Sequence, residues 1–290
     1  MKRLGCVPIM LALLGASACS ETATTKATNE APAKPPFAVN VDATAFDATS
    51  TTIDNQWWPL KPGTQLTWEG QALEGEEVIR RRIVFTVTDL TKEIAGVRTL
   101  VGWDRDFNDG TLVESELIFL AQDKAGNVWH FGQYAELWDE GQYDGGSAWL
   151  VGYLDGAKAG ILMPADPQLG QPAYSEGYAP PPFYWDDFAR VHRTGVKTCV
   201  PAGCYTDVLV IEEFEPTKPG ASQLKYYARG VGSVRTGWLG EEEEEQEELG
   251  LVRSIMLTPA QLAEARAEAL KLEARATLFG LTIPIETPAE

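Results

Sequence analysis

The clearest structural pattern in the chain is the segment VIRRRIVFTVTD at residues 78–89. Four of its large apolar side chains stand at odd positions, and four of its polar side chains stand at even positions. The apolar ones are Ile79, Ile83, Phe85 and Val87, and the polar ones are Arg80, Arg82, Thr86 and Thr88. Alternate side chains of a β-strand point to opposite faces of a sheet. The segment therefore predicts a strand with one buried and one solvated face.

Similar patterns follow along the chain. After the turn Asn108-Asp109-Gly110, apolar residues alternate with Glu114 and Glu116, and a turn at residues 123–127 leads to a run at 128–131. Further runs of strand length, separated by Gly or Pro, span residues 190–200, 204–214, 223–228, 231–238 and 249–257. Short links favour antiparallel neighbours, because parallel strands need long crossovers. We expect a mainly β domain of roughly ten antiparallel strands, as a sandwich or an open, curled barrel.

Residues 155–188 interrupt this pattern with six prolines. Proline has no N–H to donate to a sheet, so we expect irregular backbone here that covers the sheet. Long loops of this kind are often functional or packed as covers.

The last part of the domain predicts a helix over residues 258–280, followed by a tail at 281–290. Thr258 is a cap residue, Pro259 takes the first helical position and Gln261 stands three residues after the cap. An apolar stripe at helical spacing then comprises Leu262, Ala265, Ala269, Leu272, Ala276 and Phe279, and Gly280 supplies a stop. We expect the stripe to dock on the domain or on a partner.

The N-terminus has the layout of a secretory signal peptide. Lys2 and Arg3 precede an apolar run from Leu4 to Gly15, which is too short to span a bilayer permanently. Small residues immediately before Cys19 predict that cleavage removes residues 1–18. The signal peptide carries two basic residues and no acidic one, so the formal net charge of -18 becomes -20 in the mature chain.

Cys19 is the candidate site of lipidation. The residues before it resemble a bacterial lipobox, although Ala16 stands where Leu is common. Cys6 leaves with the signal peptide and Cys199 can pair with Cys204, so Cys19 is the odd thiol. We expect a lipid on Cys19 that anchors the protein to a membrane of the cell envelope, outside the cytoplasm. The alternative is a freely secreted protein with an unmodified cysteine.

The composition of the mature chain distinguishes an N-terminal tether from the β domain, and its charge argues against nucleic acids as partners. Residues 19–50 are rich in Ala, Thr, Pro and Lys, so they predict a disordered tether. Residues 51–257 form the expected β domain. The strongly negative charge of the mature chain repels nucleic acids, which argues against DNA or RNA as a partner.

Cys199 and Cys204 flank a short segment, Val200 to Gly203, that would form a hairpin loop. A disulfide across its base is feasible in an oxidising compartment, and closing so small a ring stabilises by only about 2 kcal/mol. A redox or metal site is the alternative, but the pair lacks CxxC spacing and a second cysteine pair. We predict a structural disulfide.

No sequence motif predicts catalysis, a cofactor or a metal site. His130 and His192 lie in strand-like runs without a paired nucleophile or HExxH spacing. The segment from Asp104 to Gly110 resembles a calcium loop, but its sixth and twelfth residues are Asp109 and Ser115, where the loop needs Gly and Glu. The acidic run at residues 241–248 is typical of a solvated loop. We name no catalytic residue, cofactor or metal, and favour a non-enzymatic protein.

The aromatic residues of the Pro-rich segment are the candidates for a ligand rim. They are Tyr174, Tyr178, Phe183, Tyr184 and Trp185. Aromatic faces stack on sugars or cover apolar ligands. The alternative is that these side chains belong to the core or to its cover.

Several phrases resemble those of a family of uncharacterised exported bacterial proteins and lipoproteins. They are WPLKPGT at residues 58–64, AQDK at 121–124, GNVW at 126–129, ILMPA at 161–165, VPAG at 200–203 and YYARGVG at 226–232. Arg229 stands where the family usually has Pro, and the cysteine pair is an addition. The resemblance covers residues 57–234 and implies an antiparallel β fold and export. The family has no assigned activity, so no catalytic residue is carried over.

These patterns favour an exported envelope lipoprotein whose β domain binds a ligand or docks to another envelope protein. One alternative is a carrier or receptor for a small apolar or carbohydrate ligand, and another is a secreted hydrolase. A deep apolar cavity would favour the carrier, two buried convergent carboxylates in a cleft the hydrolase, and an exposed helix stripe the docking protein.

Mass spectrometry of the mature N-terminus tests the predicted export and lipidation. We expect a chain that begins at Cys19 and carries a diacylglyceryl group on the thiol. An unmodified Cys19 would rule out the anchor, and an intact leader would rule out export by cleavage.

Overall fold

The computed structural model describes residues 37–74, 77–181, 183–243, 246–276 and 285–288. All of them belong to one compact unit of the chain. The predicted signal peptide, Cys19 and most of the predicted tether lie outside the described residues.

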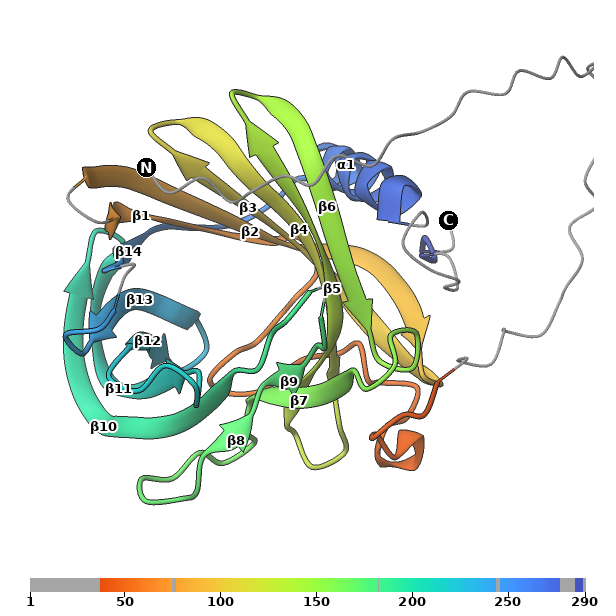
Figure 1. Ribbon diagram of the computed structural model, residues 1–290, viewed down its shortest axis with the longest axis horizontal. Helices are drawn as coiled ribbons and strands as arrows, with labels where there is room; N and C mark the ends of the chain where they lie inside the picture. Colours follow the sequence, from red (N-terminus) through yellow and green to blue (C-terminus); the bar gives the residue numbers. More distant parts are fainter. Residues whose placement is uncertain (1–36, 75–76, 182, 244–245, 277–284, 289–290) are drawn as a thin grey trace, which may run out of the picture. The chain divides into compact units, whose positions relative to one another are not determined.

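The described residues form one large antiparallel sheet and one α-helix (Figure 1). The strands are β1 (Thr64–Glu74), β2 (Glu77–Ile94), β3 (Val97–Asn108), β4 (Thr111–Gln122), β5 (Val128–Asp139), β6 (Gln142–Leu150), β7 (Lys158–Met163), β8 (Tyr174–Ser175), β9 (Gly177–Tyr178), β10 (Phe188–Val200), β11 (Gly203–Phe214), β12 (Ser222–Ala228), β13 (Gly232–Leu239) and β14 (Glu248–Met256). The expected antiparallel β class is confirmed. The sandwich alternative is wrong, because the fourteen strands belong to a single sheet that is not closed into a barrel.

The sheet rolls up so that its two edges come from adjacent stretches of chain. The strand order runs β8-β10-β11-β12-β13-β14-β1-β2-β3-β4-β5-β7-β9, with β6 paired to β5. Edge strand β8 ends at Ser175 and edge strand β9 begins at Gly177, so Glu176 alone joins them. Figure 1 shows the tight curl of β10–β13 on one side of the strands β2–β5.

Two apolar clusters lie on opposite faces of the sheet. The helix-side cluster includes Leu90, Val101, Trp103, Phe119, Phe131 and Trp149 from the sheet. The interior cluster lies within the curl and includes Leu66, Trp68, Phe85, Val87, Leu209, Ile211 and Leu251. The prediction of a solvated face for residues 78–89 is therefore wrong at its C-terminal end: Thr86 and Thr88 are fully buried, because other elements cover that face.

The helix α1 (Pro259–Ala276) begins as its sequence predicts. The Thr258 Oγ1 accepts a hydrogen bond from the Gln261 N–H, and the Gln261 side chain accepts one from the Thr258 N–H, which makes a capping box. Ala265, Ala269 and Leu272 of the predicted stripe are buried in the helix-side cluster. Phe279 and Gly280 lie outside the described residues. No helix among the described residues is long and apolar enough to cross a membrane.

Ion pairs as well as apolar contacts connect α1 to the sheet. Lys92 Nζ of β2 lies 2.6 Å from Glu273 Oε1 of α1, and both side chains are almost fully buried. Arg266 reaches Asp89, and Arg275 Nη2 donates to Glu136 Oε2 at 2.8 Å. α1 thus lies on the face of the sheet away from β10–β13 (Figure 1).

Two predicted irregular segments are more ordered than their composition indicates. Residues 37–50, assigned to the tether, lie on the domain: Phe46 is buried against Trp129 and Phe131, and Ser50 donates to the Arg98 carbonyl. Asn40 adds two hydrogen bonds with the backbone of Ala159, so apolar and polar contacts together dock the segment. Within the Pro-rich segment, β7 forms before the first proline, and β8 and β9 form between Pro172 and Pro180. They extend the sheet, and the rest of the segment covers it.

The β10–β11 hairpin carries the disulfide between Cys199 and Cys204, which are directly paired in the strand register. The Ala202 N–H in the turn donates to the Leu251 carbonyl of β14 at 2.9 Å, so the tip of the hairpin is tied to another strand.

Replacement of Glu273 by Ala should destabilise the fold by about 3 kcal/mol, because it removes the carboxylate that compensates a buried ammonium. The exposed Glu264 on the same helix is the matched control, and Glu264→Ala should cost less than about 0.5 kcal/mol. Urea denaturation measures both. Equal effects of the two substitutions would show that the buried pair does not hold α1 in place.

Candidate functional site

Charged side chains line the concave side of the curled sheet. In the β2–β3 register Ile83 faces Asp106, and Ile83 packs on the interior cluster. Residues two apart on a strand share a face, so Asp104 and Asp106 both point into the curl.

The β3–β4 hairpin places carboxylates directly opposite each other on this face. Asp104 is paired with Glu116 and Asp106 with Glu114. Like charges in directly opposed positions destabilise a sheet. Burial, followed by the charge of Asp106, raises the pKa of Asp104 to about 8. Burial and the charge of Glu114 raise the pKa of Glu116 well above its usual range. At neutral pH the hairpin therefore keeps protons that solvent-exposed carboxyls would release.

Arg81 partly neutralises this carboxylate hairpin. Its Nη2 lies 3.1 Å from Asp106 Oδ2, and its Nε lies 3.2 Å from Glu247 Oε1. The Glu247 side chain is 4% exposed. The prediction of a solvated loop is therefore wrong at this residue of the acidic run, because Arg81 draws the carboxylate inside.

Glu176 stands at the seam between the two edge strands. Its backbone N–H donates to the Asp187 carbonyl at 2.8 Å. Gly160 of β7 lets that strand lie close to the backbone of the seam, because a Cβ at this position would lie only 2.1 Å from the Gly177 nitrogen. Glu176 is only 3% exposed.

The charges around Glu176 are mainly negative. Burial, then Glu213 and Asp187, raise the pKa of the Glu176 carboxyl well above its usual range. Burial is also the main cause that raises the pKa of Asp187 to about 6 and that of Glu213 to about 6. Lys225 is the cation of this group. Although burial opposes it, the carboxylates led by Glu213 raise the pKa of Lys225.

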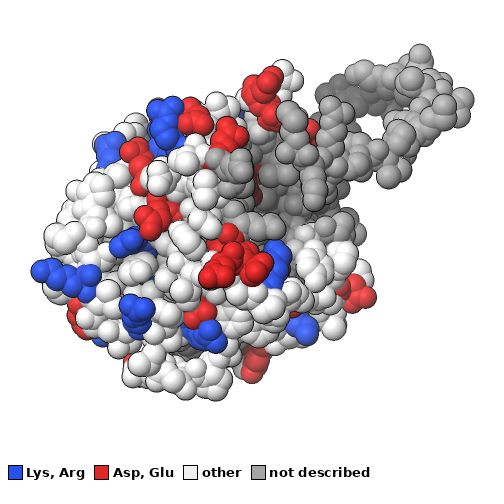
Figure 2. Space-filling model, turned by 60° about the vertical axis from the view of Figure 1, so that its left-hand side comes forward, with Lys and Arg blue, Asp and Glu red and all other residues white. Residues whose placement is uncertain are grey.

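Asp187 and Glu213 line a hollow of about 880 Å³. Its other lining residues are Phe214, Glu215, Lys218, Pro219, Ala221, Ser222, Gln223, Glu242 and Glu243. Five of the lining side chains are carboxylates, whereas Lys218 is the one cation among them and is paired with Glu215 at 2.6 Å. Figure 2 shows basic and acidic side chains interspersed on one face of the protein, with the largest acidic group near the centre of the view.

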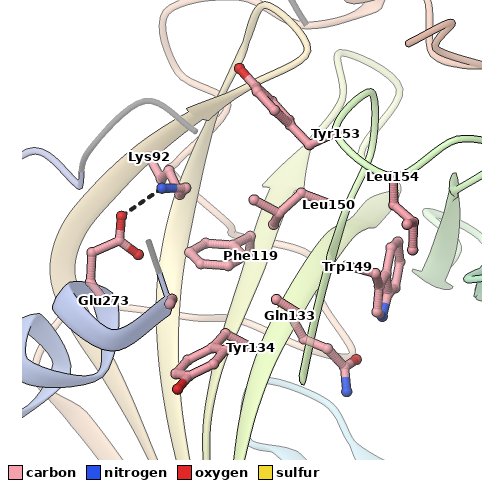
Figure 3. A pocket seen from close by; sticks show the side chains of 11 residues that line it. Lys92, Phe119, Gln133, Tyr134, Trp149, Leu150, Tyr153, Leu154 and Glu273 are labelled. Carbon is pink, nitrogen blue, oxygen red and sulfur yellow. Dashed lines mark hydrogen bonds and ion pairs between the residues drawn. The ribbon is translucent and has the colours of Figure 1, made fainter. Parts of the chain in front are cut away.

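A second cavity, of about 50 Å³, lies between α1 and the sheet. In Figure 3 the Lys92–Glu273 pair faces Phe119 and Leu150 across this space. Ligand pockets usually measure about 300–1,000 Å³. The space suits a water molecule or two, so it is not a candidate site.

The structure does not bring the five predicted rim aromatics together. Tyr174 packs on the interior cluster beside Glu176, and its hydroxyl has no hydrogen-bond partner among the described residues. Phe183 and Trp185 instead pack on Trp149 in the helix-side cluster, with Trp185 and Trp149 stacked at 5.5 Å. The remaining two, Tyr178 and Tyr184, are half-buried and exposed, respectively.

The two histidines take no part in the hollow. His130 is buried between Trp149 and Trp185, and burial lowers its pKa to about 3, which keeps the ring neutral. The His192 Nδ1 lies 3.2 Å from Glu212 Oε2. Among the described residues, no three His, Cys, Asp or Glu side chains are grouped so as to hold a metal ion.

Part of this group of carboxylates could have been predicted from the sequence. Asp104 and Asp106 stand two apart on one side of the Asn108-Asp109-Gly110 turn, and Glu114 and Glu116 stand two apart on the other. A tight hairpin centred on that turn would place the four carboxylates opposite each other. The grouping of Glu176 with Glu213 has no such local signal, because it depends on how the sheet rolls.

Comparisons with known proteins give no family. No family model matches the chain, and no curated protein matches it. A Bacteroides fragilis protein described as exported, with a YmcC-like fold, is 12% identical at a TM-score of 0.36, over 69% of this chain and 98% of that one. A Parabacteroides distasonis protein described as a lipoprotein is 12% identical at a TM-score of 0.37, over 70% of this chain and 100% of that one. These values are too low to carry a fold, location or function over to this chain.

Replacement of Asp104 by Asn should stabilise the protein at alkaline pH. The folded Asp104 carboxyl holds its proton up to about pH 8, whereas the unfolded one loses it near pH 4. Its contribution to stability is therefore full in acid and falls as the pH rises between these values. Asp104→Asn should be near neutral at pH 4 and stabilise by about 1–2 kcal/mol at pH 8.5.

The matched control for this experiment is Asp106→Asn, which removes a partner of Arg81 and should destabilise at pH 8.5. Thermal unfolding of the three proteins at both pH values provides the measurement. A variant Asp104→Asn with the same pH dependence as the parent would contradict the assignment of the buried proton to this hairpin.

Proposed function

We propose that this chain is an exported cell-envelope lipoprotein, anchored through Cys19, whose curled sheet is a ligand-binding module. The charged and apolar layout of residues 1–18 and the small residues before Cys19 support export and anchoring. The hollow beside Asp187 and Glu213 supports ligand binding. Its volume falls within the usual range for small-molecule sites.

The hollow and its two inner carboxyls carry the proposal for ligand binding. Asp187 and Glu213 line the hollow, and burial raises the pKa of each to about 6. Perturbed carboxyls in a concave site are typical of functional sites. A ligand that brings hydrogen-bond donors to them would compensate the cost of their burial.

Other functions fit the geometry less well. An apolar ligand would remove water from the carboxylates of the hollow. It would not replace the hydrogen bonds that these carboxylates make with that water. Docking through the stripe of α1 would require exposed side chains, but Ala265, Ala269 and Leu272 are buried against the sheet.

A secreted hydrolase is the second candidate, because carboxylates converge at the hollow. Glycoside hydrolysis uses one protonated and one ionised carboxyl. Burial raises the pKa of Glu176 well above its usual range, whereas it raises the pKa of Glu213 only to about 6. At neutral pH one of these two carboxyls is therefore protonated while the other is mostly ionised. Non-enzymatic binding needs only this charge arrangement and is the simpler proposal.

Native mass spectrometry of the full-length protein, extracted in mild detergent from its own host, tests the proposed function. We expect a retained small-molecule mass that is lost in Glu213→Gln, because Glu213 lines the hollow, and kept in Glu264→Gln, the control at an exposed position of α1. A wild-type protein that carries no such mass under any extraction condition would overturn the proposal. A retained mass that turns over during incubation would favour the hydrolase.

A further inference from the structure

We propose that Arg82 and Arg105 form a binding site for a phosphate monoester on the helix-side face of the sheet. Arg82 of β2 is paired with Phe107 of β3, and Arg105 stands two residues before Phe107. Residues two apart on a strand share a face, and Trp103, two residues further back, belongs to the helix-side cluster. Both arginines therefore lie on that face as diagonal neighbours, within reach of each other's long side chains. None of these residues lines the hollow, so the inference does not depend on the proposed function.

Each of the two guanidinium groups lies over an aromatic ring. The Arg82 Cζ is 4.2 Å from the centre of the Phe107 ring, and the Arg105 Cζ is 3.9 Å from the centre of the Trp103 ring. The Trp103 ring is itself fixed, because its Nε1 donates a hydrogen bond to the Ser115 Oγ at 3.0 Å. Contacts with an aromatic face hold a guanidinium in place without using its N–H donors. The two cations are therefore positioned before a ligand arrives.

Neither guanidinium group has a hydrogen-bond or ion-pair partner among the described residues. The Nε atoms of both are buried and donate to no described residue. The other arginines of the same run are paired, Arg80 with Asp109 at 2.9 Å and Arg81 with Asp106 at 3.1 Å. An arginine has five N–H donors, and a buried donor without an acceptor lowers stability. An acceptor supplied by a ligand would remove that cost.

Three carboxyl groups adjoin the two arginines without neutralising them. Asp104 points into the curl, and burial raises its pKa to about 8, so it is mostly protonated at neutral pH. Glu268 of α1 is paired with Lys271 at 2.7 Å. Glu69 stands opposite Arg82 on β1, but it is exposed and forms no ion pair with that arginine. The site therefore keeps two positive charges side by side.

The charge of the site selects the class of ligand. Burial lowers the pKa of Arg105, and among the neighbouring charges only that of Arg82 acts in the same direction, as expected for two cations close together. A phosphate monoester carries nearly two negative charges at neutral pH and has three acceptor oxygens. It can accept a pair of hydrogen bonds from each guanidinium group, whereas a carboxylate balances only one of the two charges. The phosphate can belong to a free phosphorylated molecule or to the headgroup of a lipid.

Isothermal titration of the full-length protein in mild detergent with glycerol 3-phosphate tests the inference, and acetate and glycerol serve as the singly charged and neutral controls. We expect saturable binding of the phosphate ester, much weaker binding of acetate and none of glycerol. Arg82→Gln and Arg105→Gln should each weaken binding of glycerol 3-phosphate by about tenfold or more, because each removes charge-assisted hydrogen bonds. Arg80→Gln is the matched control on the same face of β2, and it should change binding by less than about twofold, because Arg80 is exposed and already paired.

Two further variants separate a binding site from general damage to the fold. Phe107→Leu keeps both charges but removes the ring under Arg82, so it should weaken binding several-fold if positioning matters. Glu268→Gln removes a carboxylate whose charge acts on Arg105, so glycerol 3-phosphate should bind several-fold more tightly. The melting temperatures of Arg82→Gln and Arg105→Gln should stay close to that of the parent, because the loss of a cation–π contact is offset by relief of repulsion.

Dihexanoyl phosphatidic acid, titrated in the same way, identifies the source of the phosphate. Binding at least about tenfold tighter than that of glycerol 3-phosphate would identify a lipid headgroup whose acyl chains add contacts. Equal binding of the two would identify a free phosphorylated molecule. In both cases Arg82→Gln and Arg105→Gln should weaken binding, and Glu213→Gln in the hollow should leave it unchanged.

The inference is overturned if neither phosphate ester binds the parent, or if Arg80→Gln weakens binding as much as Arg82→Gln and Arg105→Gln do. Acetate that binds as tightly as glycerol 3-phosphate would also overturn it, because the site would then not select a doubly charged ligand. The proposed function of the hollow is tested by its own retained mass and by Glu213→Gln, so either result leaves the other standing.

Discussion

Every long strand of this sheet contributes side chains to two separate environments, because its alternate side chains point to opposite faces. One face packs against α1 and the segment around Phe46, and the other turns into the curl. A flat sheet could not enclose its second face, so the roll that brings β10–β13 over β1–β4 creates the interior cluster. The interior is closely packed at Gly102, where a Cβ would lie 2.7 Å from atoms of Phe85 and Ile118.

The same roll gathers charge in the interior. Asp104 and Glu116 arrive from one hairpin, Glu213 from β11 and Glu176 from the seam, and Arg81 and Lys225 offset only part of their charge. Bound protons carry some of the remainder, since burial raises the pKa of several of these carboxyls. Such an arrangement lowers the stability of the free protein. Proteins tolerate local costs of this kind mainly at functional sites, where a ligand offsets them.

The outer face shows how the protein treats charge where stability is the requirement. Lys92 with Glu273, and Arg275 with Glu136, place a cation against each buried carboxylate at hydrogen-bonding distance. The interior instead sets carboxylates directly opposite each other in the β3–β4 hairpin, where Arg81 pairs with Asp106. Buried charge is therefore compensated more fully on the helix side of the sheet than in the β3–β4 hairpin of the interior.

Local sequence determined many of the strand-forming segments, their antiparallel pairing through short turns, the cysteine-paired hairpin and the start of α1 at Thr258, but not β1, β6 or the strands of the Pro-rich segment. These features follow from alternation, turn residues and caps, which act over a few residues. The tertiary structure alone decided that the strands form one rolled sheet, that Thr86 and Thr88 are buried, and that Phe46 docks a polar segment. It also separated Tyr174 from Trp185 and brought Glu176 to Glu213, because these placements depend on which distant strands become neighbours, and periodicity within a strand holds no information about that.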